Sequence, residues 1–516
     1  MKNNILAFLG CILLLIFPSK IFSKTYYIAP NGSDTNDGSA TAPFLNLSKA
    51  VGIAIAGDII YVSGGTYSYT STINITKSGT SSNKISIIAL SGQKPVFDFS
   101  GQSLGARGIK LTGSYWVIKG IEIRGAGDNG LLIEGGSNNL IENCTFYKNR
   151  DSGLQLSKGA SNNTIKNCDS YANADPTDYG DADGFACKMD VGSNNLFTGC
   201  RAWLNCDDGW DGYLRGTNDV TNYIENSWAF KNGYFENGTD AGANANGNGF
   251  KLGGSDDKTL THNIVIKNSL AFGNKAKGFD QNSNPGSISV LNCTAHNNKG
   301  LNFRFEKAPA SGKSLIIKNC IAYQPTYNIN SAAIQENNSW TLNLTLNDSD
   351  FLSILESETL KPRKEDGSLP DIDYMHLNPK SKLIDAGVNI GLPYSGKAPD
   401  LGCFEYGLID TVDSIDTDTL NNDSTFIETF TKSIEIFCYP NPAVNYASII
   451  LNGDLNGRCR IELNSITGTH IKTLINEKIA GYFKNYVIDL HDINHGFYFV
   501  KIYLNDQLLK TEKILK

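Results

Sequence analysis

The chain has 516 residues, of which 40% are hydrophobic, 51 are glycine and 11 are cysteine. This length and composition allow one long domain with a sizeable core and a smaller second domain. The formal net charge of -7 at pH 7 argues against a nucleic-acid partner, because the chain has no surplus of positive charge to neutralise phosphates.

Residues 1–23 are predicted to be a secretory signal peptide. This segment has a positive residue at Lys2, an apolar run from Ile5 to Phe17 and a small residue at Ser23, which is the layout of such peptides. The mature protein is therefore expected to begin near Lys24 and to leave the cytoplasm.

Residues 24–406 are predicted to form the main domain. Short β-type runs between Thr25 and about Tyr115 are expected to form the first coils and to cap one end. From Trp116 to Tyr323 an Asn or Gly is followed six residues later by a second Asn: Asn143/Asn149, Asn167/Asn173, Gly199/Asn205, Asn226/Asn232, Asn268/Asn274 and Asn292/Asn298. A repeat of roughly 24 to 42 residues with Asn/Gly turns indicates a solenoid, here an all-β fold of the parallel β-helix type.

Cysteine and asparagine are expected to have structural roles inside the coils. Five cysteines share one position of the repeat: Cys144, Cys168, Cys200, Cys293 and Cys320. We expect them to stack as small buried side chains rather than to form disulfides. The paired asparagines are expected to form inward ladders that hydrogen-bond the backbone of the turns.

A glycine marks another position of the repeat, in the order Gly130, Gly153, Gly184, Gly209, Gly249, Gly278 and Gly300. Two residues after these glycines stand Leu132, Gln155, Ala186, Asp211, Lys251, Asp280 and Asn302. Stacked coils place equivalent residues about 4.8 Å apart. A row that ought to be apolar therefore carries charge in its central coils, where we expect the functional site.

Four aspartates, here called the acid cluster, lie near this position in two successive coils: Asp183, Asp207, Asp208 and Asp211. Carboxylates so close repel one another unless a cation lies between them. A site made of oxygen ligands suits Ca²⁺. Trp210 and Tyr213 are expected to flank the acids with aromatic surface for a sugar.

Lys251 occupies the same position of the repeat as Asp211, one coil further on. A neighbouring Ca²⁺ would lower the pKa of its amine toward the range of a general base. Asn282 and Arg304, on the following coils, are expected to extend a groove for an anionic polymer, with Arg304 as a carboxylate clamp.

The motifs of the central coils resemble the polysaccharide lyase family 9 pectate lyases: Asp181–Ala186, Asp207–Asp211, Gly247–Gly254 and Gly278–Asn282. The resemblance extends from Thr25 to about Tyr406. It implies a right-handed parallel β-helix, Ca²⁺ bound by the four aspartates of the acid cluster, and Lys251 as the Brønsted base. Where a bulky residue usually follows the last Asp of the pattern, this chain has Gly212, which affects the shape of the groove.

The periodicity fades from Asn328 to Tyr406, a segment expected to pack along the solenoid. Residues 407–433 are rich in Asp, Thr and Ser and read as a linker. Residues 434–516 contain regular β-type runs and are predicted to form a small C-terminal β-sandwich.

This last domain resembles the type A sorting domain of the type IX secretion system, with Tyr439-Pro440-Asn441-Pro442, Gly496-Phe497-Tyr498 and a basic final strand from Lys510 to Lys516. The resemblance implies export through the periplasm to the medium or the cell surface. A carbohydrate-binding sandwich is the alternative interpretation.

Together these features predict a secreted, calcium-dependent lyase that cleaves polygalacturonate or rhamnogalacturonan I by β-elimination. The expected partners are an acidic plant cell-wall polysaccharide and the type IX secretion machinery, and the chain is expected to be a monomer. A β-helix glycoside hydrolase with paired aspartates and a non-catalytic surface glycan-binding protein are the alternatives.

Overall fold

The computed structural model describes residues 23–324, 326–407, 435–439, 446–452, 457–466, 468–479 and 483–516. The predicted signal peptide and linker lie outside the described residues except at their edges, and so does most of the Tyr439-Pro440-Asn441-Pro442 motif. The chain divides into two compact units, Met1–Thr411 and Val412–Lys516. Within the described part of the chain, no helix is both long and apolar enough to cross a membrane.

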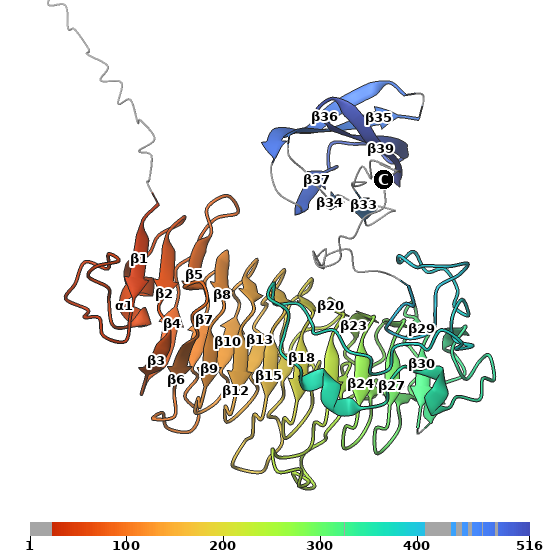
Figure 1. The fold of residues 1–516 in the computed structure, drawn as a ribbon, viewed down its shortest axis with the longest axis horizontal. Coiled ribbons are helices and arrows are strands. Elements are labelled where there is room, and N and C mark those ends of the chain that lie inside the picture. Colours follow the sequence, from red (N-terminus) through yellow and green to blue (C-terminus); the bar gives the residue numbers. More distant parts are fainter. Residues whose placement is uncertain are drawn as a thin grey trace, which may run out of the picture. The chain divides into compact units, whose positions relative to one another are not determined.

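The first unit is a parallel β-helix in which each regular coil adds one strand to each of three sheets (Figure 1). The first sheet has 12 strands, in the spatial order β1 (Thr25–Ile28), β2 (Ile59–Val62), β5 (Ile85–Ala89), β8 (Trp116–Lys119), β11 (Leu140–Glu142), β14 (Thr164–Lys166), β17 (Leu196–Thr198), β20 (Val220–Glu225), β23 (His262–Lys267), β26 (Ile288–Leu291), β29 (Leu315–Lys318) and β32 (Ile334–Glu336).

The second and third sheets have 10 strands each. The second contains β4 (Ile73–Ile75), β7 (Ile109–Leu111), β10 (Leu131–Glu134), β13 (Leu154–Ser157), β16 (Phe185–Cys187), β19 (Trp210–Asp211), β22 (Phe250–Lys251), β25 (Phe279–Asp280), β28 (Phe303–Phe305) and β31 (Tyr327–Ile329). The third contains β3 (Gly65–Ser68), β6 (Pro95–Asp98), β9 (Glu122–Arg124), β12 (Thr145–Tyr147), β15 (Asp169–Tyr171), β18 (Arg201–Trp203), β21 (Trp228–Phe230), β24 (Leu270–Phe272), β27 (Thr294–His296) and β30 (Ile321–Tyr323).

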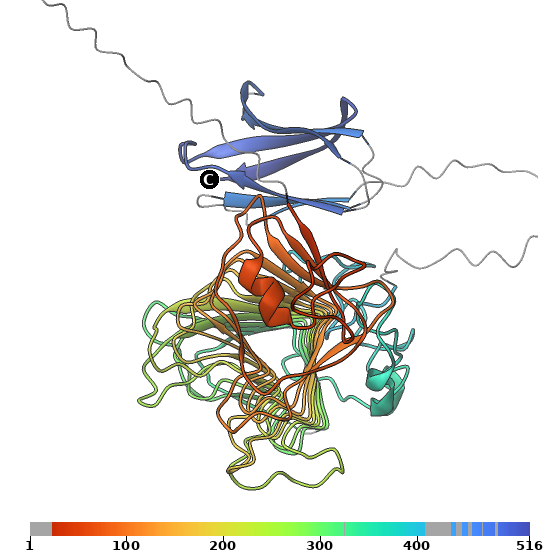
Figure 2. The same cartoon turned by 90° about the vertical axis from the view of Figure 1, so that its left-hand side faces the viewer.

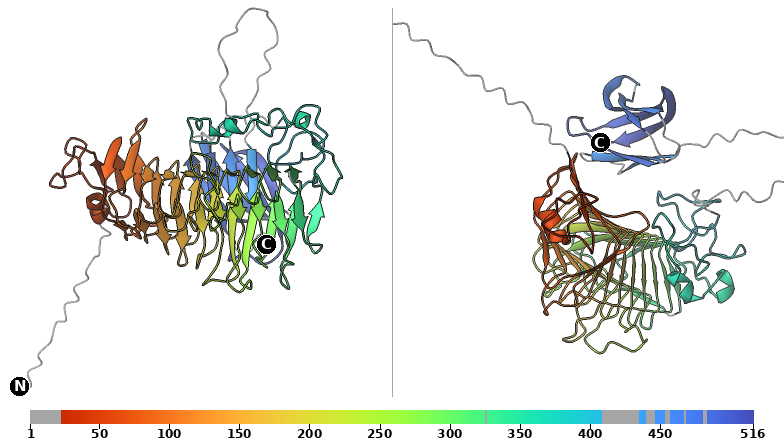
Figure 3. Two further views of the ribbon diagram at one scale, coloured as in Figure 1. Left: turned by 90° about the horizontal axis from the view of Figure 1, so that it is seen from below. Right: turned by 60° about the vertical axis from the view of Figure 1, so that its left-hand side comes forward.

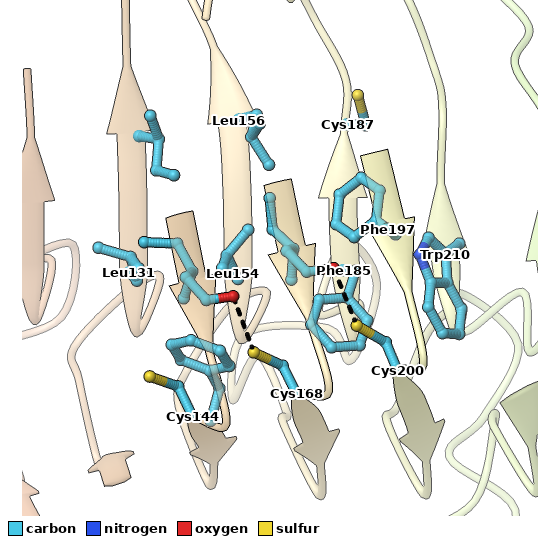
Figure 4. Close-up of a cluster of buried hydrophobic side chains, with 14 of the residues drawn as sticks. Leu131, Cys144, Leu154, Leu156, Cys168, Phe185, Cys187, Phe197, Cys200 and Trp210 are labelled. Atoms are coloured by element: carbon cyan, nitrogen blue, oxygen red, sulfur yellow. Dashed lines mark hydrogen bonds between the residues drawn. The ribbon is translucent and has the colours of Figure 1, made fainter. Parts of the chain in front are cut away.

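The core of the β-helix is a continuous column of inward side chains, because alternate residues of a strand face opposite sides of the sheet. In β12, for example, Phe146 is fully buried while Thr145 and Tyr147 face outward. Figure 4 shows leucine, phenylalanine and cysteine side chains of successive coils stacked in this column. The five cysteines of the repeat are buried and free, as predicted from the sequence.

The asparagine ladder is confirmed only for the second residue of each pair. Each of these buried side chains accepts a hydrogen bond at Oδ1 from a backbone N of the preceding coil, along Asn149, Asn173, Asn205, Asn232, Asn274 and Asn298. The first members, such as Asn143 and Asn167, instead occupy turns with positive φ. Asparagine tolerates this left-handed conformation better than most residues, which explains the residue type without an inward role.

Both the N-terminal end and one flank of the β-helix are covered. The helix α1 (Leu47–Ile53) lies at the N-terminal end, where it buries Leu47, Ala50 and Val51 (Figure 2). The late segment contains the short 3₁₀ helices η1 (Asp348–Asp350) and η2 (Glu356–Leu360). Its apolar side chains pack on outward residues of the third sheet in one cluster, which includes Tyr374 and Phe272. The predicted packing along the solenoid is therefore confirmed.

The second unit is a small antiparallel β-sandwich (Figure 3). One sheet has the order β33 (Glu435–Tyr439), β34 (Tyr446–Asn452) and β37 (Phe483–Asp489); the other has the order β36 (His470–Ile479), β35 (Gly457–Ser465), β38 (Phe497–Leu504) and β39 (Gln507–Leu515). Buried residues of both sheets, among them Ile449 and Ile461, share one core. The predicted fold class, a β-helix followed by a β-sandwich, is confirmed.

Candidate active site

A row of outward-facing residues on the second sheet carries the charges predicted from the repeat. The strand register pairs Ala186 with Asp211, Asp211 with Lys251, Lys251 with Asp280 and Asp280 with Arg304. The predicted row is correct in the central coils but wrong at its C-terminal end, where Arg304 rather than Asn302 follows Asp280. Asn302 takes the place of the glycine, since its carbonyl oxygen accepts from Phe279 N as that of Gly278 accepts from Phe250 N.

The inward residues of the same strands form an aromatic stack that fixes the positions of the charged row. Trp210 lies between Phe185 and Phe250, with ring centroids 4.9 and 4.7 Å away. Its side chain is in the core, only 2% exposed (Figure 4). The prediction that Trp210 offers aromatic surface to a sugar is therefore wrong, because its neighbour Asp211 takes the outward face of this strand.

Three members of the acid cluster meet at the turns that lead into β16 and β19. The carboxylate oxygens of Asp183, Asp207 and Asp208 lie within 4.8 Å of one another, and all three residues are buried. Gly184 N donates to Asp208 O at 2.9 Å, and this hydrogen bond joins the coil of β16 to the coil of β19. Asp208 N donates to Asp183 Oδ1 at 3.2 Å.

The next coil supplies donors that orient two of these carboxylates. Asn248 donates to Asp208 Oδ1 through its backbone N at 2.7 Å and its Nδ2 at 2.8 Å. The backbone N of Asn246 donates to Asp207 Oδ1. Burial raises the pKa of Asp207 and of Asp208 to about 7, and the neighbouring carboxylates act in the same direction.

The geometry of the acid cluster fits a hard divalent cation. Asp208 Oδ2 is buried and accepts no hydrogen bond from any described residue, although Lys251 Nζ lies 3.2 Å away. A buried carboxylate oxygen without a hydrogen-bond donor is costly. Carboxylate oxygens gathered in this way suit Ca²⁺, which takes oxygen ligands.

Asp211 stands beside the three converging carboxylates, between two lysines. Its Oδ1 lies 3.5 Å from Lys251 Nζ and its Oδ2 lies 3.5 Å from Lys188 Nζ. Tyr213 N also donates to Asp211 Oδ1, at 3.0 Å. Burial alone would raise the pKa of Asp211, but the charges of Lys251 and Lys188 outweigh it and lower this pKa below its usual value.

Lys251 lies where the sequence predicted, next to the acid cluster. Its side chain is 11% exposed, and its Nζ lies 5.7 Å from the centroid of the Tyr213 ring. Burial would lower the pKa of Lys251, yet the charges of the acid cluster outweigh burial and raise this pKa well above its usual value. A bound cation is expected to lower this pKa. The upward shift therefore comes from the negative charges of the carboxylates.

Sequence reasoning missed Lys188. Its side chain is 3% exposed and its Nζ lies 2.7 Å from Asp183 Oδ2. The charges of Asp183, Asp211 and Asp151 raise the pKa of Lys188 well above its usual value, although burial opposes them. The available signal was its place directly after β16, two residues beyond the motif Asp181–Ala186.

The remaining predicted substrate-binding residues are near the surface with partners of their own. Tyr213 donates through its hydroxyl to Asp256 Oδ1 at 2.7 Å. Asn282 has a positive φ and donates from Nδ2 to Gly253 O at 3.0 Å. Arg304 is 36% exposed and pairs with Glu306 at 2.7 Å, so a substrate carboxylate would have to compete for its guanidinium group.

The chain is similar to known proteins over most of its length. Residues 26–338 match the family described as Pel9A-like, right handed beta helix region, and residues 438–516 match the secretion system C-terminal sorting domain. Both resemblances noted in the sequence are thereby confirmed. Pectate lyase L of Dickeya chrysanthemi is 41% identical over 396 residues, covering 74% of this chain and 90% of the relative.

Two solved structures extend this similarity to the fold. The crystal structure of pectate lyase Pel9A has a TM-score of 0.69 and 40% sequence identity, and covers 74% of this chain and 96% of that chain. A rhamnogalacturonan lyase has a TM-score of 0.60 and 28% identity, and covers 69% of this chain and 97% of that chain. Both sequence identities extend over nearly the whole length of the two relatives. The similarity is therefore one of sequence as well as of the solenoid fold.

Proposed function

The chain belongs to the Pel9A-like right-handed β-helix family and is a pectate lyase-like polysaccharide lyase, and from this premise we propose that it cleaves a galacturonate backbone by calcium-dependent β-elimination, with Lys251 as the base. One observation carries the proposal. A lysine side chain lies 3.2 Å from a buried carboxylate whose two acidic neighbours lie within 4.8 Å of it.

The acid cluster is proposed to hold the metal ion. Asp183, Asp207 and Asp208 would supply converging oxygens, and Asp211 would complete the set from the neighbouring strand. When bound, Ca²⁺ supplies Lewis-acid chemistry that stabilises the negative charge developing on the uronate carboxylate. Asn248 and Asn246 hold the carboxylates of Asp208 and Asp207 in their orientations through the hydrogen bonds described above.

Lys251 is proposed to accept the proton from C5 of the uronate. As Nζ takes this proton, the C5–H electron pair forms the double bond between C4 and C5, and the bond from C4 to the glycosidic oxygen breaks. The leaving oxygen keeps the electron pair of this bond and stays with the next sugar, where it becomes a hydroxyl group by taking up a proton, which balances the proton held by Lys251. No water is consumed. A glycoside hydrolase would instead use a pair of carboxylates. That mechanism gives Lys251 no role.

The charge state of Lys251 links its chemistry to the acid cluster. Nζ must be neutral before it can accept a proton, and the charges of Asp211 and Asp208 favour the protonated form. Balancing these carboxylate charges lowers the pKa of Lys251 toward that of a working base. The proposed base is therefore expected to be active only when the acid cluster is neutralised.

The relatives suggest which pectin backbone to test first. Pectate lyase L of Dickeya chrysanthemi and pectate lyase Pel9A share 41% and 40% identity with this chain, whereas the rhamnogalacturonan lyase shares 28%. This difference favours polygalacturonate over rhamnogalacturonan I. The sorting domain indicates type IX secretion to the cell surface or medium, where such polymers are met, and we propose that the chain passes through the periplasm on the way.

The function is tested by following the ultraviolet absorbance of the unsaturated product on polygalacturonate and on rhamnogalacturonan I. We expect absorbance to rise with calcium and to stop with excess chelator. Asp208→Asn should lose calcium affinity while the protein stays folded, because its other coils are unaffected. New reducing ends without absorbance would indicate a hydrolase, binding without cleavage would indicate a glycan-binding protein, and full activity in chelator would contradict the calcium site.

A further inference from the structure

Lys188 is a buried lysine that the proposed reaction does not use. It follows β16, and its Nζ lies 2.7 Å from Asp183 Oδ2 and 3.5 Å from Asp211 Oδ2. Nζ also donates to the carbonyl oxygen of Asp181 at 3.4 Å. With its side chain 3% exposed, Lys188 is too deeply buried to act on a polymer at the surface.

The two lysines of the site take opposite oxygens of one carboxylate. Asp211 turns Oδ1 toward Lys251 and Oδ2 toward Lys188. Lys188 alone also reaches Asp183, whose Oδ2 accepts a further hydrogen bond from Ser152 Oγ at 3.1 Å. Buried carboxylates without a counter-charge are strongly destabilising, and Lys188 provides that charge from a buried position.

We infer that Lys188 is an internal counter-cation of the acid cluster, which holds Asp183 and Asp211 in place when calcium is absent and weakens calcium binding when it is present. The inference rests on the proposed calcium site. Its physical basis is that a positive charge within hydrogen-bond distance of one proposed ligand, and close to a second, repels an incoming cation.

This role differs from that of an ordinary buried ion pair. A purely structural pair stabilises the calcium-free and the calcium-loaded protein equally, so its loss leaves calcium affinity unchanged. A residue that stabilises the calcium-free form more than the loaded form must, by thermodynamic linkage, weaken calcium binding by the same factor. Lys188→Met separates the two cases, because it removes the charge with little change in side-chain length.

The experiment measures calcium binding by titration calorimetry, and Tm in calcium and in chelator, for the full mature chain. We expect Lys188→Met to bind calcium at least about tenfold more tightly than the wild type, since it removes a positive charge that lies close to two proposed ligands and repels a divalent cation. The rise in Tm on adding calcium should be larger in Lys188→Met than in the wild type.

Arg201→Met is the matched control. Arg201 is also buried, pairs with Asp169 at 2.8 Å and lies on the third sheet rather than the second. Its loss should lower Tm equally in calcium and in chelator and leave calcium affinity unchanged.

The outcomes distinguish this inference from the proposed function. Calcium binding by the wild type with equal or weaker binding by Lys188→Met would overturn the role of Lys188 alone. No calcium binding by the wild type would overturn both. If Lys188→Met folds only in calcium, the inference is supported, and if it folds in neither condition, Lys188→Gln, which keeps an N–H donor without the charge, decides by the same affinity criterion.

Discussion

At the scale of single residues, the stacking of coils converts a position in the repeat into a contact. Asp211 and Lys251 are separated in sequence by a whole coil, which includes β20 and β21, yet they are register partners on β19 and β22. Strands that pair in register lie about 4.8 Å apart, so a carboxylate and an amine on the same face must interact. The position of each charged residue is consequently fixed by strand pairing with the coil before it and the coil after it.

The proposed base is tested by Lys251→Ala. We expect turnover to fall by roughly 10² to 10⁴-fold, as for the loss of other general bases, while calcium binding is retained because Lys251 is no ligand. Lys251→Arg should restore little, since a guanidinium group stays protonated at moderate pH. Product absorbance at saturating substrate measures the effect.

A control for Lys251→Ala is Lys267→Ala. Lys267 is a partly exposed lysine on the first sheet that pairs with Glu225 at 2.9 Å, and its loss should leave turnover unchanged. If Lys251→Ala kept near-normal turnover, the base would have to be sought elsewhere in the row.

The acid cluster also predicts how the stability of the calcium-free protein depends on pH. Asp207 and Asp208 have a pKa of about 7 when folded, against a usual value of about 4 for Asp in unfolded chains. Between these values the folded state binds more protons than the unfolded state, so the free energy of unfolding falls as the pH rises from about 4 to 7. The loss should be on the order of a few kcal/mol.

This pH dependence is measured by urea unfolding at pH 5 and pH 8, in chelator and in calcium. In chelator the protein should be more stable at pH 5. In calcium the difference should vanish or reverse, because the metal favours ionised carboxylates. Asp208→Asn should flatten the dependence in chelator, and equal stability of the wild type at both pH values in chelator would contradict the prediction.

At the scale of elements, the sequence predicts the coils better than it predicts the faces of their strands. The periodic Asn and Gly positions were sufficient to predict stacking, the acid cluster and its contact with Lys251. The inward position of Trp210 follows from the outward position of Asp211 on β19, since successive residues of a strand face opposite sides, so the expected contact of Trp210 with a sugar conflicts with the predicted row itself. The shift from Asn302 to Arg304 has another origin: Gly300 comes two residues too early to mark the start of the strand that pairs with β25, and this irregularity has no sequence period.

The late segment shows what repeats cannot predict. Arg363 comes from outside the periodic coils, yet it donates to Asp169 Oδ1 at 2.7 Å, to Cys168 O at 3.0 Å and to Gly199 O at 2.9 Å. Such a contact joins residues far apart in the chain and depends on the path of an irregular segment, which has no sequence period. Only the general packing of this segment along the solenoid could be predicted.

Removing Arg363 should detach this segment before the coils unfold. Arg363→Ala leaves Asp169, whose side chain is 13% exposed, with one of its two arginine partners, and because Arg201 still compensates the charge we expect a cost below the about 3 to 5 kcal/mol typical of breaking a buried pair. Hydrogen exchange should become faster in the segment around Tyr374 and stay slow in β15 and β18. Arg124→Ala, which breaks a more exposed pair with Asp98, should cost less than about 1 kcal/mol, and unchanged exchange in Arg363→Ala would contradict the prediction.

At the scale of the whole molecule, catalysis and export belong to separate units. The acid cluster, Lys251 and all three parallel sheets lie in the unit that ends at Thr411. The match to the sorting domain begins at residue 438, in the other unit. The two hydrophobic cores share no residue, so each unit has the means to fold around its own core.

A truncation after Ser433 tests whether catalysis and export belong to separate units. The shortened chain keeps every described strand of the β-helix and the whole proposed site, so its specific activity on polygalacturonate should equal that of the full chain. In a host with type IX secretion machinery it should nevertheless remain in the periplasm, because it lacks the region that matches the sorting domain. Activity assays of medium, cell surface and periplasmic extract measure the distribution, and a fusion of residues 434–516 to an unrelated exported protein is the reciprocal control, expected outside the cell. Normal release of the truncated chain would show that the sorting signal lies in the β-helix. Inactivity of the purified truncated chain would show that the sandwich is needed for the β-helix to fold.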